Sequence, residues 1–349
     1  MSQKLKKILN FVLIFGTLAI VLIIGFSGNE LGSAVTALKS IHVGWIALCV
    51  AAYACFVAID AASIHFFLRR HDTPISYSYA LFVSISGSYY SNITPGATGG
   101  QPMQVYYMKK QGVPIGIGTA AITVKFFCFQ LMLQVIATVG WLTNGPFIAQ
   151  QLSGNMWILV VGYIYNAFCV GLVVMMAVSK RLVRFVVNLF IKAGTKLRIC
   201  KDPEASRARW GNILETFHSS VMMVARNPMD LIVQLLLGGA QLLVQTAIIF
   251  FVYLAFHLDG TSCWQIIAMG VLQYISAAYT PLPGASGAQE GVFALYFAGI
   301  FPDGIHFMAL LLWRFFTYYL SLAVGAVVTL SNGFRKKAEK PPEEAENPS

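Results

Sequence analysis

One short string of helix-breaking residues occurs twice in this chain, each time inside strongly apolar sequence. The first copy is Pro-Gly-Ala-Thr-Gly-Gly-Gln at 95–101, and the second is Pro-Gly-Ala-Ser-Gly-Ala-Gln at 283–289. Backbone groups left unpaired by Pro and Gly cannot face lipid, so such segments at membrane depth line an enclosed or water-filled cavity. Paired interruptions in two halves of a chain are typical of a transporter site. The interrupting residues are Pro95, Gly96, Gly99, Gly100, Pro283, Gly284 and Gly287.

A cation follows each copy of the string at nearly the same distance. Lys125 stands thirty residues after Pro95, and Arg314 stands thirty-one residues after Pro283, both in apolar sequence. Two helix-breaking strings, each followed at nearly the same distance by an intramembrane cation, predict two structural repeats. The alternative is a pair of unrelated turns with cations that extend to the membrane surface. We favour the repeats, because charges inside a membrane are rare and usually functional.

The composition places the chain among integral membrane proteins. Of its 349 residues, 57% are hydrophobic and 11% are charged, which excludes a large soluble domain. The net charge of +10 comes from Lys and Arg clusters in loops, which indicates topology determinants and not a nucleic-acid site. The six cysteines are scattered without a CxxC pair or a histidine at ligand spacing. We therefore expect no disulfide framework, metal site or cofactor.

Six apolar runs are long enough to cross the hydrocarbon core, which takes about 20 helical residues. The first run follows Lys4, Lys6 and Lys7 and is longer than a signal-peptide core, so we interpret it as an uncleaved helix. The regions 76–110 and 262–301 hold the repeated strings between shorter apolar stretches, and we predict re-entrant helical hairpins there. The six predicted spans are 8–27, 43–68, 115–143, 155–179, 229–257 and 305–331.

Basic clusters determine the predicted orientation. Basic loops stay in the cytoplasm, and all clusters fall on that side only if both interrupted regions are hairpins. The hairpins then open from opposite faces, which gives two repeats of inverted topology, with an uncharged outer loop at 144–155. We predict an all-α polytopic protein of the bacterial inner membrane, with both termini cytoplasmic. The clusters are Lys4–Lys7, Arg69–Arg70, Lys109–Lys110, Lys180–Arg184 and Arg335–Lys337.

The two repeats are joined by a basic linker. We predict a first membrane repeat over 1–179, a cytoplasmic or interfacial linker over 180–228, a second repeat over 229–331 and a disordered tail over 332–349. Apolar residues at helical spacing in the linker favour a helix on the membrane surface, and a solvated connector is an equal alternative. Those residues are Trp210, Leu214, Phe217 and Val221.

Two carboxylates in apolar segments are the candidate partners of the two cations. Asp60 lies in the second predicted span, and Glu290 directly follows the second string. Lys125 and Arg314 each lie about 13 Å deep along their helices, at roughly 1.5 Å per residue. Because isolated charges are costly there, each cation meets either a carboxylate or an anionic ligand. Arginine suits bidentate phosphate contact, and lysine acts as a point charge.

The half-helices after the strings offer a second way to bind an anion. A helix that begins inside a cavity directs its unpaired N–H groups and its positive dipole end toward a phosphate. Gln101 and Gln289 begin these helices, where their amides either contact a headgroup or cap and connect helices. We assign most tyrosines near the strings to the interfacial belt. The sequence holds no nucleotide-binding or hydrolase motif, so we predict no catalytic residues.

At the repeated strings, the sequence resembles the membrane domain of lysylphosphatidylglycerol synthase/flippase proteins of the MprF type. The matching features are TPGATGGQ and LPGASGAQE with Lys125 and Arg314, and the likeness covers about 8–331. In the bifunctional members, such a domain moves an aminoacylated phospholipid between leaflets, and a soluble domain transfers lysine from lysyl-tRNA to phosphatidylglycerol. Only a short tail follows Leu330, so we expect no synthase domain here. Gln101 departs from relatives, which often carry an acidic residue there.

Together these features predict a lipid translocase and not an enzyme. The substrate is an anionic or aminoacylated phospholipid, or a polyprenyl-phosphate lipid. The alternative is a phosphatidylglycerol lysyltransferase that uses lysyl-tRNA, or a partner subunit in that lipid-modification and cationic-peptide-resistance pathway. We expect no other nucleic-acid partner, and a homo-oligomer stays open. The predicted headgroup-binding residues are Lys125, Arg314, Asp60, Glu290, Gln101 and Gln289.

Overall fold

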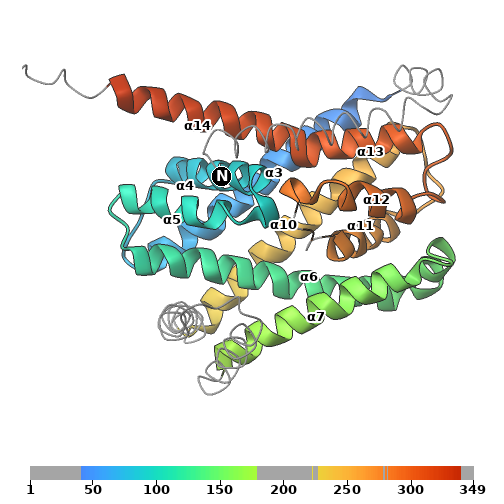
Figure 1. The fold of residues 1–349 in the computed structure, drawn as a ribbon, viewed down its shortest axis with the longest axis horizontal. Coiled ribbons are helices and arrows are strands. Elements are labelled where there is room, and N and C mark those ends of the chain that lie inside the picture. The colour runs from blue at the N-terminus through green and yellow to red at the C-terminus, as the bar shows by residue number, and fades with distance from the viewer. Residues whose placement is uncertain (1–40, 179–221, 223–226, 278–279, 281, 339–349) are drawn as a thin grey trace, which may run out of the picture.

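The computed structural model describes residues 41–178, 222, 227–277, 280 and 282–338. All regular elements in these residues are helical. Most helices run along the long axis of the molecule, so their connections lie mainly at its two ends (Figure 1). The predicted first span at 8–27 and the predicted linker helix around Trp210 lie outside the described residues.

Four described helical stretches are long and apolar enough to cross a membrane, and each matches a predicted span. A further apolar helix, α7 (Met156–Val178), matches the predicted span 155–179. The all-helical membrane class is therefore confirmed, whereas the number of six full spans stays a prediction. The four stretches are α3 (Val43–Arg70), α6 (Ile115–Gln151), α10 (Pro228–Ala255) and the continuous segment His306–Thr329.

The predicted outer loop that begins at residue 144 is wrong, because α6 continues through it to Gln151. The helix is interrupted only at Asn144, where the backbone φ is −125°. Pro146 lies two residues later, near the start of the next helical turns, where a missing N–H costs least. The Asn144 side chain donates to the Gly140 carbonyl at 3.1 Å. This hydrogen bond satisfies a backbone group at the kink, so the helix bends there and does not end.

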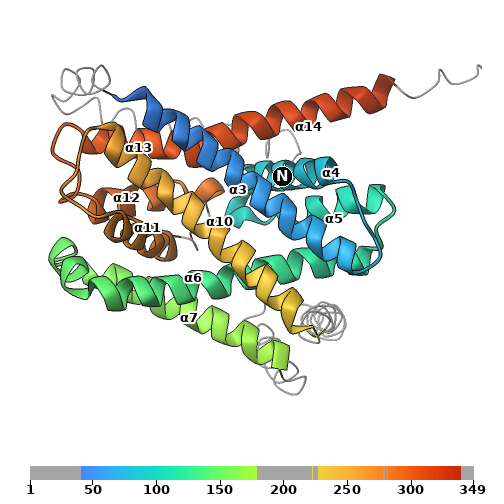
Figure 2. The same ribbon diagram turned by 180° about the vertical axis from the view of Figure 1, so that it is seen from behind.

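Each repeated string forms a tight turn between two short helices that pack against each other. Figures 1 and 2 show one such unit at each end of the molecule, and the two turns contact each other between them. That these units enter a membrane from opposite faces stays a prediction. The first unit is α4 (Tyr77–Ile93), η1 (Pro95–Ala97) and α5 (Gly100–Lys110), and the second is α11 (Cys263–Ala277), η2 (Pro283–Ala285) and α12 (Ala288–Tyr296).

The helices α3 and α10, each of which precedes one of these units in the chain, run side by side through the centre of the molecule (Figures 1 and 2). Ser63 donates to the Gln234 side chain at 2.6 Å, and Gln234 donates to the Ser63 carbonyl at 3.0 Å. At the end of α3, Arg70 pairs with Asp230 near the start of α10 at 2.9 Å. The helices α3 and α10 are thus joined by polar contacts as well as by apolar packing.

The last helical stretch changes its winding directly after Arg314. It consists of α13 (His306–Arg314), the π-helical segment η3 (Phe315–Tyr319) and α14 (Leu320–Ala338), so it passes the predicted end at residue 331. A π-helical segment inside an α-helix is rare and is frequently found at functional sites. This segment therefore draws attention to the surroundings of Arg314.

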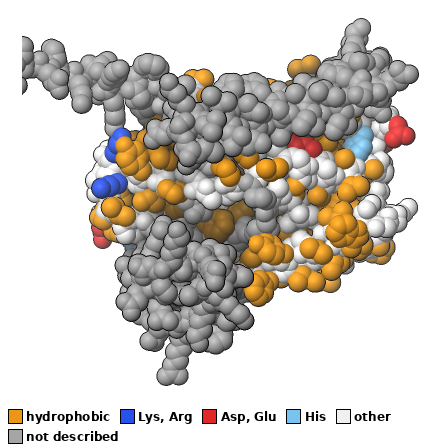
Figure 3. All heavy atoms as spheres, in the orientation of Figure 1, with side chains coloured by type: hydrophobic (Ala, Val, Ile, Leu, Met, Phe, Trp, Pro, Cys, Tyr) orange, Lys and Arg blue, Asp and Glu red, His pale blue; other side chains and the backbone are white. Residues whose placement is uncertain are grey.

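Exposed apolar side chains mark a surface suited to lipid. On α7, Trp157, Val161, Ile164 and Phe168 follow one helix face, and each is at least 60% exposed. Figure 3 shows hydrophobic side chains over the described part of one face, with Lys and Arg side chains at one end. The basic last turns of α3 and α5 lie at that same end (Figures 1 and 2). An apolar middle with a basic end is the pattern expected of a membrane protein.

Candidate functional site

The two strings adopt the same unusual backbone conformation. Gly96 and Gly284 have φ of 59° and 60°, and the alanines that follow them, Ala97 and Ala285, have φ of 55° and 49°. A positive φ is readily adopted by glycine but costs an alanine about 1–2 kcal/mol. Both turns therefore hold an alanine in a strained conformation, which indicates that the surrounding structure requires this shape. The repeat seen in the sequence extends to backbone geometry.

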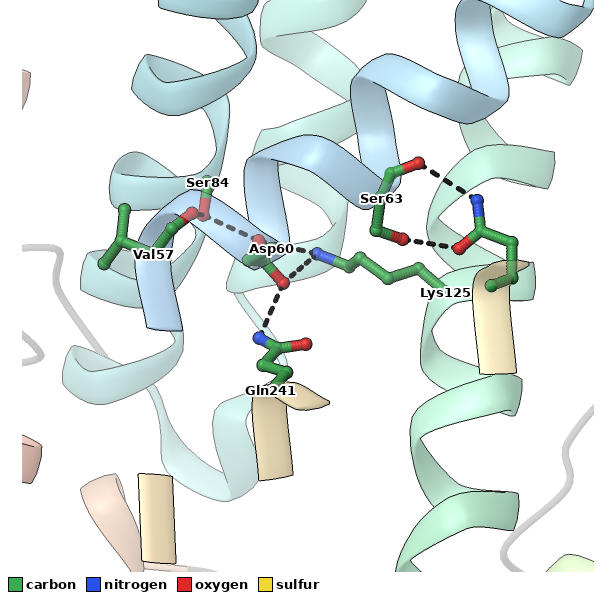
Figure 4. A network of polar contacts seen from close by, with 7 residues as sticks. Val57, Asp60, Ser63, Ser84, Lys125 and Gln241 are labelled. Carbon is green, nitrogen blue, oxygen red and sulfur yellow. Dashed lines mark hydrogen bonds and ion pairs between the residues drawn. The ribbon is translucent and has the colours of Figure 1, made fainter. Parts of the chain in front are cut away.

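Lys125 of α6 pairs with Asp60 of α3, as the sequence analysis anticipated. The Lys125 ammonium lies 2.8 Å and 2.9 Å from the two carboxylate oxygens, and both side chains are nearly buried. The same carboxylate accepts a hydrogen bond from Ser84 of α4 at 2.7 Å and from Gln241 of α10 at 3.0 Å (Figure 4). Four helices thus contribute to one charged cluster, and through Gln241 it includes α10.

Arg314 pairs with Glu290, the second predicted ion pair. The Arg314 Nε atom donates to Glu290 at 2.7 Å, and its terminal nitrogen donates to the Gly284 carbonyl in the turn η2 at 3.2 Å. The second Glu290 oxygen accepts from the Gly287 backbone N–H at 2.7 Å. Arg314 and Glu290 therefore hold the second turn and the start of α12 together. The side chains of this pair are only 6% and 10% exposed.

This arrangement corrects the expectation for the start of α12. We expected its unpaired N–H groups to await a phosphate, but the carboxylate of Glu290 accepts one of them. The anion at this helix start is thus part of the protein, and it also neutralises the cation of the second repeat. At the first turn, the Gly99 N–H is accepted by the Thr94 hydroxyl at 2.9 Å, without a charged group. The two strings share a backbone shape but differ in electrostatics.

The two turns are held against each other by residues around the π-helical segment. The Tyr318 hydroxyl donates to the Asn92 carbonyl at 3.3 Å, and the Asn92 amide donates to Ser321 at 3.2 Å. The Tyr318 ring also lies directly against Gly284, where an added Cβ would collide with it. Tyr318 therefore contacts the end of α4 and the turn η2 at once, so a change in Tyr318 would be felt at both turns.

A cavity of about 360 Å³ reaches both turns and both cations. Among the described residues, its charged lining consists of Lys125, Asp60 and Arg314. Gln101 and Gln289, near the starts of α5 and α12, also line it, whereas Glu290 lies behind Arg314. The volume is near the lower end of ligand pockets, about 300 to 1,000 Å³, which suits a headgroup and not a whole lipid. The structure thus brings five of the six predicted headgroup-binding residues to one cavity.

Comparison with known proteins agrees with this architecture. The family profile described as lysylphosphatidylglycerol synthase TM region matches residues 8–325. The chain belongs to this family. A UPF0104 membrane protein of Archaeoglobus fulgidus is 21% identical over 260 residues, which cover 72% of this chain and 76% of that protein. The resemblance drawn from the two strings and their cations is therefore confirmed, as is a place in a membrane, while the bacterial inner membrane and the orientation of the termini stay predictions.

In this member of the lysylphosphatidylglycerol synthase TM region family, the sequence analysis missed the uncharged polar groups of the site. Gln241 and Ser84 hold the Asp60 carboxylate, and Gln273 donates to Gln289. A usable signal was present on α10, where Gln241 and Gln245 recur four residues apart in a strongly apolar run. Polar residues on one face of an apolar helix point to the protein interior and not to lipid.

Proposed function

We propose that this protein moves lipids with anionic headgroups between the two leaflets of the membrane. The observation that carries this proposal is the lining of one cavity by Lys125 of the first repeat and Arg314 of the second, beside both turns. Buried cations on transmembrane helices face a substrate path or a partner charge. Here each cation has a partner carboxylate and also borders the cavity. Such a pair can release part of its charge to an arriving phosphate.

The Lys125 pair is the more suitable of the two for exchanging partners. When the Lys125 ammonium moves away, the Asp60 carboxylate still accepts hydrogen bonds from Ser84 and Gln241, so it keeps polar partners. Arg314 makes two described hydrogen bonds, and a guanidinium has five N–H donors, so donors remain for a phosphate oxygen. We propose that Lys125 exchanges its partner Asp60 for the headgroup phosphate. Arg314 binds the phosphate through the guanidinium N–H donors that its two described hydrogen bonds leave available.

The proposed path uses the two helix–turn–helix units as re-entrant hairpins from opposite faces. The turns contact each other beside the cavity, so passage of a headgroup requires them to separate on one side at a time. Arrangements of this kind are known in transporters with inverted repeats, which alternate access around a central site. The acyl chains would remain in the bilayer next to the apolar outer surface.

Leaflet exchange in proteoliposomes tests the proposal. The full chain is reconstituted with fluorescent phosphatidylglycerol, and the lipid in the outer leaflet is followed by chemical quenching. We expect exchange with the unchanged protein and its loss with Lys125→Gln. The double variant D60N/K125Q removes both charges, so it avoids an unpaired buried carboxylate. If the double variant folds and exchanges lipid at the original rate, Lys125 serves only as a counter-ion and the proposal is wrong.

Two controls complete this experiment. Gln150→Leu changes an exposed residue outside the cavity lining, and we expect its exchange rate to equal that of the unchanged protein. Incubation with lysyl-tRNA and phosphatidylglycerol tests the transferase alternative, because lysyl-lipid would form only if the chain catalysed the transfer. Labelled lysyl-lipid without leaflet exchange would replace our proposal by that alternative.

A further inference from the structure

Seven of the 14 glutamines in this chain line the one cavity that holds the two cations. They come from five different helices, so no single segment explains their gathering. Four of them are buried, and a buried amide without a hydrogen bond costs about 1–3 kcal/mol, so these four need partners. The lining glutamines are Gln101 and Gln104 of α5, Gln130 of α6, Gln241 and Gln245 of α10, Gln273 of α11 and Gln289 of α12.

Some of these amides stabilise the site, and others have no hydrogen bond to another described residue. Gln241 donates to Asp60, and Gln273 donates to Gln289. By contrast, the side chains of Gln101, Gln104 and Gln245 form no hydrogen bond within the part of the chain that the structure describes. These three amides border the cavity. They are thus available to a molecule inside it.

The position of Gln104 shows that the fold makes room for such an amide. Gln104 is only 5% exposed, and its side chain lies against Gly87 of α4, where an added Cβ would collide with it. A glycine at this contact lets a long polar side chain fit between α4 and α5 and border the cavity. A buried amide held in this way and lacking a described partner indicates a ligand with complementary groups.

The charges of the cavity limit what else this ligand carries. The described lining holds Lys125 and Arg314 against Asp60, which Lys125 already neutralises. Glu290 lies behind Arg314 and accepts from it and from Gly287. Among the described residues, no carboxylate without a cation borders the cavity to receive an ammonium group. The lining therefore favours one anionic group and disfavours an aminoacyl group.

Resting on the proposed function, we infer that the translocated lipid carries a hydroxyl-rich headgroup on a single phosphate. An amide both donates and accepts hydrogen bonds, and a hydroxyl group does the same, so the three available glutamines match a polyol. Lys125 and Arg314 supply the charge for the phosphate. The substrate class is thus a glycerol-, inositol- or sugar-phosphate lipid, which we expect to be preferred over aminoacylated lipids.

Leaflet exchange of three lipids tests this inference on the unchanged full chain. The lipids are phosphatidylinositol, with a polyol; phosphatidic acid, with the phosphate alone; and lysylphosphatidylglycerol, with an added amine. We expect phosphatidylinositol to exchange about tenfold faster than either of the others, the effect of one or two hydrogen bonds. Equal rates for the first two lipids, or fastest exchange of the lysyl lipid, would overturn the inference and leave the translocase standing. If none of the three lipids exchanged between leaflets, both this inference and the proposed translocase function would be wrong.

Variants then assign the selectivity to the amides. Gln101→Leu and Gln245→Leu keep a similar side-chain volume and remove the hydrogen-bonding groups. We expect each to slow phosphatidylinositol several-fold more than phosphatidic acid, and Gln150→Leu, outside the cavity lining, to leave both rates as they were. A loss of both rates together in folded variants would contradict a role in recognising hydroxyl groups.

Discussion

The Lys125–Asp60 ion pair makes a quantitative prediction about stability. Removing Lys125 alone, as in Lys125→Met, leaves a nearly buried carboxylate without its cation, which generally costs about 3–5 kcal/mol. Asp60 retains hydrogen bonds from Ser84 and Gln241, so we place the cost near the lower limit, about 3 kcal/mol. Asp60→Asn alone leaves the ammonium unpaired and is expected to cost a similar amount. The double variant D60N/K125M has no uncompensated charge and is expected to stay within about 1 kcal/mol of the original protein.

The free energy of unfolding, measured by denaturant titration in mixed micelles, checks this cycle. The two single variants and the double variant give a coupling energy, which we expect to be about 5 kcal/mol and to favour the pair, because the two single losses together far exceed the loss in the double variant. Ser63→Ala, which removes an uncharged hydrogen bond between α3 and α10, is the matched control, with an expected cost of about 1 kcal/mol. Additive effects of the single variants would refute the reasoning, because they would show that the two charges do not compensate each other in the folded protein.

Two further predictions concern the turns and the orientation. Gly284→Ala is expected to destabilise the protein by at least about 1 kcal/mol more than Gly96→Ala, because both residues have positive φ but only Gly284 lies against the Tyr318 ring. The free energies of unfolding of the two variants check this prediction. Equal losses of stability would contradict it. If the two units are re-entrant hairpins, a cysteine in place of Lys109 reacts with a membrane-impermeant thiol reagent added on the cytoplasmic side. A cysteine in place of Asp259 then reacts with the same reagent added on the outer side. Reaction of both cysteines from one side would show that the predicted topology is wrong.

The sequence was sufficient to predict the ion pairs of the site. Three carboxylates lie in the predicted apolar spans and hairpins, and Asp230 stands at the very start of its span. Because intramembrane charges strongly prefer partners, Asp60 and Glu290 were the main candidates for the two cations. The observed distances of 2.8 Å to Lys125 and 2.7 Å to Arg314 agree with that reasoning. The approximate positions of the long helices were predictable for a similar reason, because the length of an apolar run reflects membrane thickness.

The remaining features depend on tertiary contacts that no local pattern reports. The bond from Arg314 to the Gly284 carbonyl requires a turn shape that only the folded chain defines. The continuation of α6 past Asn144 depends on a side chain that satisfies the backbone at a kink. The gathering of glutamines at the cavity arises from helices far apart in the sequence. A neutral amide is a weaker signal than a charge, so this part of the site was visible only in three dimensions.

The most direct test of the central claim is to locate a headgroup in the full-length protein. Cryo-electron microscopy in nanodiscs that contain phosphatidylinositol would show where the lipid phosphate lies. We predict phosphate density in the cavity between η1 and η2, within hydrogen-bond distance of Lys125 or Arg314, and its loss in the D60N/K125Q variant. Well-resolved lipid headgroups found only at the outer apolar surface, with water alone in the cavity, would contradict the account.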